Sequence, residues 1–169
     1  MQYIKGMQFY QNDKKTAITL GKFDGLHRGH ETLIERVIEH QKNDGVDSVV
    51  FAFDMAPLYE KIKKKKESLI TNEERAGRLF GRVDYLVECP FVEAVSKIEA
   101  ETFIKEILVK QFHAKYIVVG TDFHFGYQKK GDYHMLQQYS GEYGYEVEVI
   151  EKKCYEDREI SSTYIKEEV

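Results

Sequence analysis

The sequence contains little cysteine, little proline and no tryptophan. Cys89 and Cys154 are too few for a disulfide framework, so we expect them to be ordinary core or surface residues in a reducing compartment. The 169 residues include only two prolines, and the sequence contains no Pro/Gly/Ser-rich linker and no internal repeat. A single domain over residues 1–169 is therefore predicted.

Long apolar runs and an excess of basic residues are also missing. No stretch resembles the run of about 20 apolar residues that crosses a membrane, and the amino terminus is too polar for a secretory signal. These absences predict a cytoplasmic protein without a membrane partner. A net charge of −4 argues against nucleic acid as a partner. An anionic ligand would then be held by a local group of residues rather than by the field of the whole protein.

The sequence does contain an alternation of strand-like and helix-like segments. Short β-branched or continuous apolar runs predict five strands, at residues 16–21, 47–53, 84–89, 115–120 and 145–151. Helices are predicted at residues 30–45, 71–83, 99–112 and 132–144. Two of these helices carry apolar stripes, made by Leu33, Ile34, Val37 and Ile38 and by Ala100, Phe103, Ile104, Ile107 and Leu108.

This order of elements predicts an α/β, Rossmann-like, doubly wound fold. Its expected form is a mostly parallel five-stranded sheet with helices on both faces. Ligands of such sheets bind beyond the carboxyl ends of the strands, near the topological switch point. The loops at residues 21–30, 54–70 and 120–132 are therefore the candidates for a binding site.

The loop after the first predicted strand reads GKFDGLHRGH, residues 21–30. It leads into a helix whose free N–H groups and dipole favour an anion. Gly21 and Gly25 allow a tight turn close to a ligand, while His27 and His30 share a helical face and can donate to one phosphate. The alternatives are that the histidines cap the helix or bind a metal; no further Cys/His pair at ligand spacing supports zinc.

Three other segments each have a functional and a structural interpretation. The aromatic residues within 118–132 either stack on a flat ligand or form core beneath a long loop. The hydroxyl residues at 161–163 either cap a helix or hold a phosphate. The lysine run at 61–67 is either a solvated segment or a flap over an anionic substrate.

Taken together, these motifs resemble the FMN adenylyltransferase (FAD synthetase) domain of the bacterial bifunctional riboflavin kinase/FAD synthetases, in the nucleotidylyltransferase superfamily. GKFDGLHRGH is similar to the family's G-x-F-D-G-x-H-x-G-H, and DYLVECPF, FIKEILVKQFHAKYIVVGTDFHFGYQKKGD and ISSTYIK are similar to later segments in the same order. The first motif alone indicates only the superfamily. Gly25 directly after Asp24, with D-F-x-F-G and K-G-D, indicates the flavin branch.

The resemblance implies transfer of the adenylyl group of ATP to FMN, which gives FAD and pyrophosphate without a covalent enzyme intermediate. It implies ATP and FMN as substrates and Mg²⁺ bound with ATP, while no protein ligand for a metal stands out. The implied residues are His27, His30 and Lys166 for catalysis, Gly21, Phe23, Asp24, Gly29, Ser162 and Thr163 for ATP, and Pro57, Asp122, Phe123 and Phe125 for the flavin.

The sequence departs from the family pattern in four places. FDMAP, residues 53–57, lacks the family's proline and histidine at its third and fourth positions, and Lys166 stands in place of arginine. Asp122 and His124 stand where asparagine and arginine are common. The chain also ends soon after the last motif, so a riboflavin kinase domain is expected only in a longer parent chain.

Two alternative functions stay open on the sequence alone. One is a related nucleotidylyltransferase that uses another phosphorylated acceptor. The other is a flavin- or nucleotide-binding protein of low activity, for which the departures in FDMAP and at Lys166 leave room. The DFHFG segment favours flavin as the ligand.

Overall fold

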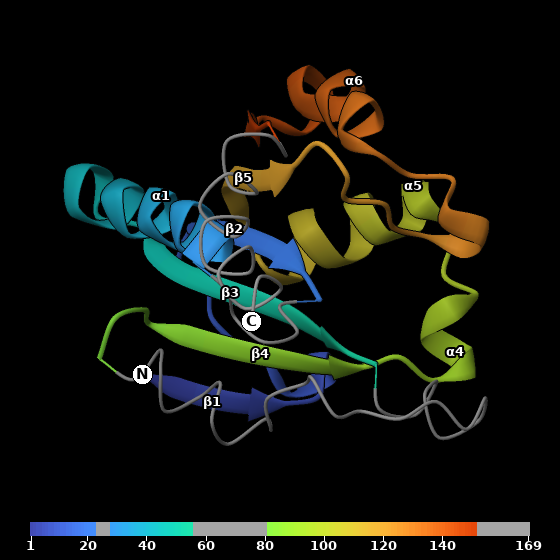
Figure 1. The fold of residues 1–169 in the computed structure, drawn as a ribbon, viewed down its shortest axis with the longest axis horizontal. Helices are drawn as coiled ribbons and strands as arrows, with labels where there is room; N and C mark the ends of the chain where they lie inside the picture. The colour runs from blue at the N-terminus through green and yellow to red at the C-terminus, as the bar shows by residue number, and fades with distance from the viewer. Residues whose placement is uncertain (23–27, 56–80, 152–169) are drawn as a thin grey trace, which may run out of the picture.

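Six parallel strands form the centre of the molecule (Figure 1). The computed structural model describes residues 1–22, 28–55 and 81–151. Its sheet has the order β1-β4-β3-β2-β5-β6, and every neighbouring pair is parallel. The strands are β1 (Gln2–Lys5), β2 (Thr16–Gly21), β3 (Asp47–Asp54), β4 (Tyr85–Pro90), β5 (Ala114–Gly120) and β6 (Glu146–Ile150). The predicted α/β class and parallel sheet are confirmed, but the count of five strands is wrong.

The additional strand is β1, at the edge of the sheet beside β4. Its Tyr3 lies opposite Leu86 of β4 in the register of the pair. None of its four residues is fully buried, so they form neither the continuous apolar run nor the alternation by which a strand is recognised in a sequence. Pairing with a strand much later in the chain makes this segment a strand.

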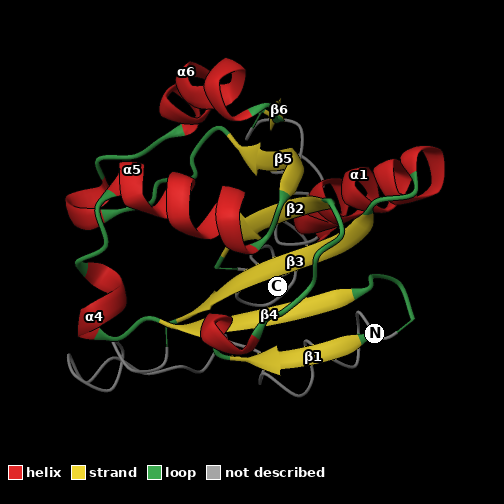
Figure 2. Ribbon diagram, turned by 180° about the vertical axis from the view of Figure 1, so that it is seen from behind, coloured by secondary structure: helices red, strands yellow, loops and turns green. Residues whose placement is uncertain are grey.

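Helices cover both faces of the sheet (Figures 1 and 2). α1 (Arg28–Asp44) lies on one face, while α5 (Ala100–Thr102) and the π-helix η2 (Phe103–Gln111) lie on the other. α6 (Tyr133–Tyr143) connects β5 to β6 and packs against β6 and η2. Shorter helices are η1 (Met7–Phe9), α4 (Glu93–Ser96) and η3 (Tyr127–Lys129). In the described residues no helix has the length and apolar character that a bilayer span requires.

The predicted apolar stripes face the sheet and form two cores. From α1, Leu33, Ile34 and Val37 are buried, and Ile38 packs against them while partly exposed. The five stripe residues of α5 and η2 are all buried on the opposite face. Burial of one such aliphatic side chain stabilises the fold by about 1.5–3 kcal/mol, so the two stripes fix both helices against the sheet. The helix predicted at 71–83 falls largely outside the described residues.

The strand order places the topological switch between β2 and β5. From β2 the chain runs through α1 to β3 and β4 on one side of the sheet. It then returns through η2 to β5 and β6 on the other side. The chain therefore leaves the carboxyl end of β2 toward one face of the sheet and the carboxyl end of β5 toward the other. Open parallel sheets bind their ligands at this arrangement.

Candidate functional site

The turn after β2 leads from the centre of the sheet to the start of α1. Gly21 ends β2 opposite Ala52 of β3 and is half-buried. α1 begins at Arg28, so Gly29 and His30 belong to its first turn, although the side chain of His30 lies outside the description. A helix start at the carboxyl end of a central strand is the backbone feature that the predicted phosphate site requires.

The loop after β5 folds back on itself and packs against α5. Phe125 and Gly131 form an antiparallel bridge, in which each N–H donates to the other residue's carbonyl, at 3.1 and 2.8 Å. Gly126 has a φ of +80°, and a Cβ at this position would lie only 2.6 Å from Cα of Ala100. Two glycines of the DFHFGYQKKGD segment are therefore needed for the close packing of this loop.

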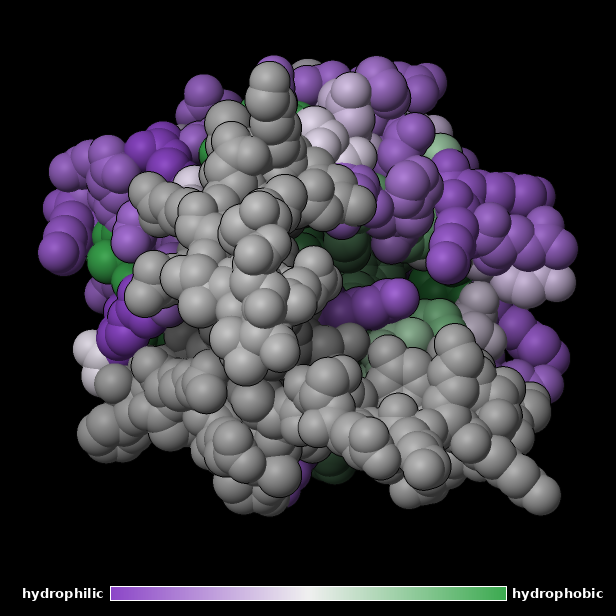
Figure 3. Space-filling view, in the orientation of Figure 1, coloured by the Kyte–Doolittle hydropathy of each residue, from purple (hydrophilic) through white to green (hydrophobic). Residues whose placement is uncertain are grey.

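Aromatic rings gather at the carboxyl end of the sheet. The ring centroid of Phe53, at the end of β3, lies 6.5 Å from that of Phe123 and 6.2 Å from that of Phe91. Phe125 also stacks on Phe123, and the two ring centroids lie 5.6 Å apart with an angle of 16° between the ring planes. We refer to Phe53, Phe91, Phe123 and Phe125 as the aromatic cluster. Figure 3 shows apolar surface between hydrophilic residues at this end of the sheet, the right-hand side of that view.

The members of the aromatic cluster differ in their exposure. Phe125 is 4% exposed and Phe53 is 8% exposed, whereas Phe123 and Phe91 are half-buried. The ring of Phe123 is therefore partly accessible, while the ring of Phe125 contacts it from inside the core. The core interpretation of the loop aromatics is thus confirmed for Phe125, whereas stacking of a ligand on Phe123 stays a prediction.

Phe53 and Phe91 are not among the residues predicted for the site. The register of β3 on β4 brings them together, and the N–H of Phe91 donates to the carbonyl of Asp54 at 2.8 Å. The one signal in the sequence is a phenylalanine at or just after the end of each of two buried strands. That signal cannot reveal which strands are neighbours.

The strand ends and the loop that carry the aromatic cluster also carry charged residues. Asp54 ends β3, and Asp122 is exposed directly after β5. Lys129 and Lys130 are exposed at the tip of the loop. Gln128 and Lys129 both have a φ of 56°, a left-handed backbone that non-glycine residues adopt rarely and that clusters at active sites and ligand-binding regions.

Cys89, at the carboxyl end of β4, does not supply a nucleophile. Burial, with a smaller contribution from the Asp54 carboxylate, raises the pKa of its thiol to about 11. The thiol is therefore protonated at neutral pH, and only the thiolate is a strong nucleophile. The prediction that Cys89 is an ordinary core residue is confirmed, since it is 1% exposed.

The structure leaves part of the predicted site undescribed. The structure describes four of the predicted residues in full, which are Gly21, Asp122, Phe123 and Phe125. For Gly29 and His30 it describes only the helix backbone. Within residues 1–22, 28–55 and 81–151, no cluster of three or more His, Cys, Asp or Glu residues forms a metal centre. The predicted residues that lie outside the description are Phe23, Asp24, His27, Pro57, Ser162, Thr163 and Lys166.

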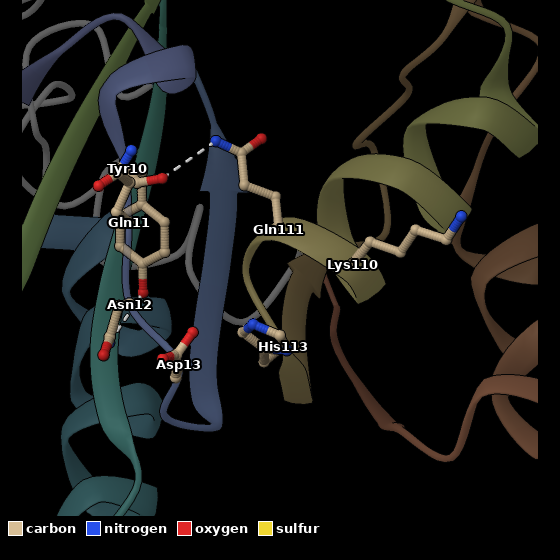
Figure 4. A pocket seen from close by; sticks show the side chains of 7 residues that line it. All are labelled: Tyr10, Gln11, Asn12, Asp13, Lys110, Gln111 and His113. Atoms are coloured by element: carbon tan, nitrogen blue, oxygen red, sulfur yellow. Dashed lines mark hydrogen bonds between the residues drawn. The ribbon is translucent and has the colours of Figure 1, made fainter.

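A separate hollow of about 450 Å³ lies at the opposite end of the sheet (Figure 4). Its lining comes from the segments that precede β2 and β5, so it opens at the amino ends of these strands. Ligands of parallel sheets bind at the carboxyl ends, and this hollow is therefore distinct from the candidate site. It is lined by Tyr10, Gln11, Asn12, Asp13, Lys110, Gln111 and His113.

The FAD synthetase family matches residues 9–164 of the sequence. The chain belongs to the FAD synthetase family. The match includes the turn after β2, the aromatic cluster and the loop after β5, and of the predicted site residues only Lys166 lies beyond the end of this FAD synthetase match.

Individual relatives extend the same similarity. A bifunctional riboflavin kinase/FMN adenylyltransferase of Escherichia coli K12 is 31% identical over 153 residues, which cover 89% of this chain and 49% of that protein. The protein of the same name from Haemophilus influenzae is 30% identical over 170 residues, covering 99% of this chain and 55% of that protein. The chain thus spans about half the length of these FAD synthetase relatives.

Solved structures confirm the fold of this FAD synthetase family member. A Streptococcus pneumoniae crystal structure described as a macrolide-efflux protein has a TM-score of 0.73 and 25% identity, with 89% of this chain and 50% of that chain covered. A pantoate–β-alanine ligase from Francisella tularensis has a TM-score of 0.51 and 12% identity, with 89% and 67% covered. The second likeness supports the fold alone.

Proposed function

We propose that this chain transfers the adenylyl group of ATP to FMN, which forms FAD and pyrophosphate. The observation that carries the proposal is the match to the FAD synthetase family over residues 9–164. Two features of the fold support it: α1 begins at the topological switch point, and the aromatic cluster lies at the same end of the sheet. We also propose that the reaction takes place in the cytoplasm, which supplies ATP.

The chemistry of this reaction asks for positioning rather than for a nucleophile on the enzyme. An oxygen of the FMN phosphate attacks the α-phosphorus of ATP, and a new P–O bond forms. The P–O bond between the α-phosphorus and the bridging oxygen to the β-phosphate breaks, and pyrophosphate leaves with the electron pair. Because the FMN phosphate is already ionised at neutral pH, no general base is required. The protein must align the two phosphates and neutralise the charge on the leaving group.

The nucleotide side of the proposed site is built on the start of α1. The N–H groups of the first helical turn and the helix dipole attract the ATP phosphates. Gly21, Phe23, Asp24 and Gly29 are assigned to binding of ATP on this side. The side chains assigned to charge neutralisation are His27 and His30 on this side and Ser162, Thr163 and Lys166 on the other.

The flavin side of the proposed site is built on the aromatic cluster. Phe123 offers the half-buried ring on which the planar isoalloxazine stacks, and stacking of this kind contributes roughly 1–3 kcal/mol per ring. Phe125 acts from below by holding Phe123 in place, since its own ring is buried. Asp122 is exposed next to Phe123 and can accept hydrogen bonds from the flavin. Pro57 is assigned to the same side.

Mg²⁺ would enter the site with ATP. This ion is usually held by phosphate oxygens and one or two carboxylates, and Asp54 and Asp122 supply carboxylates at the carboxyl ends of β3 and β5. β3 and β5 are not neighbours in the sheet, and within the described residues no group of three or more acidic, His or Cys residues could hold the ion. When bound, Mg²⁺ would neutralise part of the negative charge of the triphosphate.

The direct test is to incubate the purified chain with ATP, Mg²⁺ and FMN and to separate the products by chromatography. FAD and pyrophosphate in equal amounts are expected, with little product from CTP or from other phosphorylated acceptors. His30→Ala should lower kcat by roughly 100-fold, as loss of one donor to a developing charge does. His134→Ala, at a side chain of α6 that is 70% exposed, is the control and should keep wild-type kcat.

The outcomes separate the parts of the proposal. Absence of FAD from the wild-type chain, with both ligands bound, would contradict the proposed activity and favour a binding function. FAD formation by His30→Ala within about twofold of wild type would contradict the role given to His30.

A further inference from the structure

An ion pair between distant parts of the chain lies at the first turn of α1. Arg82, which precedes β4, donates from Nη1 to Oε1 of Glu31 at 3.0 Å and from Nη2 to Oε2 at 2.6 Å. Both carboxylate oxygens are therefore engaged by one guanidinium, which is the strongest and most directional geometry for such a pair. The side chains of Arg82 and Glu31 are 34% and 30% exposed, so the pair is partly shielded from water.

Glu31 directly follows His30, and its carboxylate belongs to the first turn of α1. A carboxylate in this turn is attracted by the free N–H groups and by the positive end of the helix dipole. The proposed function places the ATP phosphates at the same N–H groups. An unpaired Glu31 would compete with the phosphates for these groups and would repel them.

The hydrogen bonds from Arg82 counter both effects. They occupy both oxygens of Glu31, and they bring a positive charge to the side of the helix. Glu35, one turn further along α1, also attracts the guanidinium, and hydrogen bonding to Glu31 is the main reason why the pKa of Arg82 is raised. Arg82 therefore faces two acidic residues on the helix that begins at the phosphate end.

We propose that Arg82 is a positioning residue for ATP, which acts through Glu31 by neutralising and holding the carboxylate that α1 carries beside the proposed phosphate site. This inference rests on the proposed function, since it needs the triphosphate at the start of α1. It adds to that function a residue outside the recognised motifs and a reason why a negative side chain is tolerated next to His30.

A charge mechanism and a purely mechanical link predict different results in a double-mutant cycle. Arg82→Ala leaves Glu31 unneutralised, so the KM for ATP should rise roughly five- to tenfold while the KM for FMN stays within about twofold. Glu31→Gln leaves the positive charge of Arg82 unopposed and should lower the KM for ATP. The double variant restores the net charge, and its KM for ATP should return to within about twofold of wild type. If the pair were only a mechanical link, all three variants would share one raised KM.

A second pair on the same helix supplies the control. Arg36 of α1 binds Glu148 of β6, with Nη2 to Oε2 at 2.7 Å, and it therefore also ties α1 to the sheet. Arg36→Ala should lower the unfolding temperature as much as Arg82→Ala does or more, without a comparable rise in the KM for ATP. The effect of Arg82→Ala should also shrink at 0.5 M NaCl, where the Debye length is only about 4 Å.

The outcomes distinguish this inference from the proposed function. FAD formation by wild type together with an unchanged KM for ATP in Arg82→Ala overturns only the inference, as does a double variant that is as impaired as Arg82→Ala. If wild type binds MgATP without forming FAD, the same cycle is read from the dissociation constant of MgATP, and the same pattern of signs supports the inference while the proposed reaction fails. Absence of both ATP binding and FAD formation overturns the two together.

Discussion

The sharpest structural prediction concerns Gly126 in the loop after β5. A methyl group at this position would lie 2.6 Å from Cα and Cβ of Ala100 and 2.7 Å from its backbone N. Rotation of a side chain cannot relieve this crowding, because the nearest atoms belong to the backbone of α5 or are bonded to it. The φ of +80° adds a second cost, since L-residues avoid this region.

The two costs can be summed to an order of magnitude. Left-handed backbone costs about 1–2 kcal/mol for a residue with a Cβ, and overpacking costs typically about 1–3 kcal/mol. Gly126→Ala should therefore lower the free energy of unfolding by about 3 kcal/mol, which for a domain of this size corresponds to a fall in Tm of about 6–12 °C. Because the loop also carries Phe123 and Phe125, its displacement should raise the KM for FMN more than the KM for ATP.

Urea unfolding followed by far-UV circular dichroism measures the first effect, and steady-state FAD formation measures the second. Gly141→Ala is the matched control, since nothing lies within 4 Å of a Cβ built at Gly141 in α6. It should stabilise the protein by up to about 1 kcal/mol, because alanine is the better helix former. A Gly126→Ala protein with wild-type unfolding midpoint and wild-type KM for FMN would refute the reasoning about this loop.

Three further predictions follow from single side chains. Thr19 is fully buried, and within the described part of the chain its Oγ1 has no hydrogen-bond partner; Thr19→Val should therefore raise the free energy of unfolding by about 1 kcal/mol in urea, and a loss of stability would contradict this. Phe123→Ala should raise the KM for FMN roughly tenfold at unchanged KM for ATP, and equal changes in both constants would count against a flavin-side role. The N–H of Met135 donates to Asp132 at 3.1 Å, which is the main reason why the pKa of Asp132 lies below its usual range. Asp132→Ala should cost about 1 kcal/mol at pH 7. The difference in unfolding free energy between wild type and Asp132→Ala should persist above about pH 4 and vanish as the pH falls through the lowered pKa of Asp132. The reason is that a group with a depressed folded-state pKa stabilises the fold only while its carboxylate is ionised. Asp132→Asn keeps the cap without titrating and should stay within about 0.5 kcal/mol of wild type at pH 7.

Local patterns in the sequence determined the fold class and predict the type of site. The stripe of Leu33, Ile34 and Val37 predicts a helix with one buried face, because residues three and four apart share a side of any helix. The continuous apolar run in β3 predicts a strand covered on both faces. Gly21 and His30 likewise sit in a motif whose order along the chain predicts a turn at the start of a helix, and the structure places α1 there.

Tertiary structure alone decided what pairs with what. β1 is a strand only because β4 offers hydrogen bonds to it, and its own residues carry no periodic signal. Phe123 and Phe125 look alike in the sequence, yet the bridge to Gly131 turns one ring into the core and leaves the other half-buried.

The same holds for contacts between segments that are far apart in the chain. Phe53 and Phe91 meet because β3 and β4 are neighbours in a particular register. Arg82 reaches Glu31 across a separation of 51 residues. Periodicity reports only what a residue shares with its neighbours a few positions away. Register and strand order bring distant residues together, and they are set by the packing of the whole sheet.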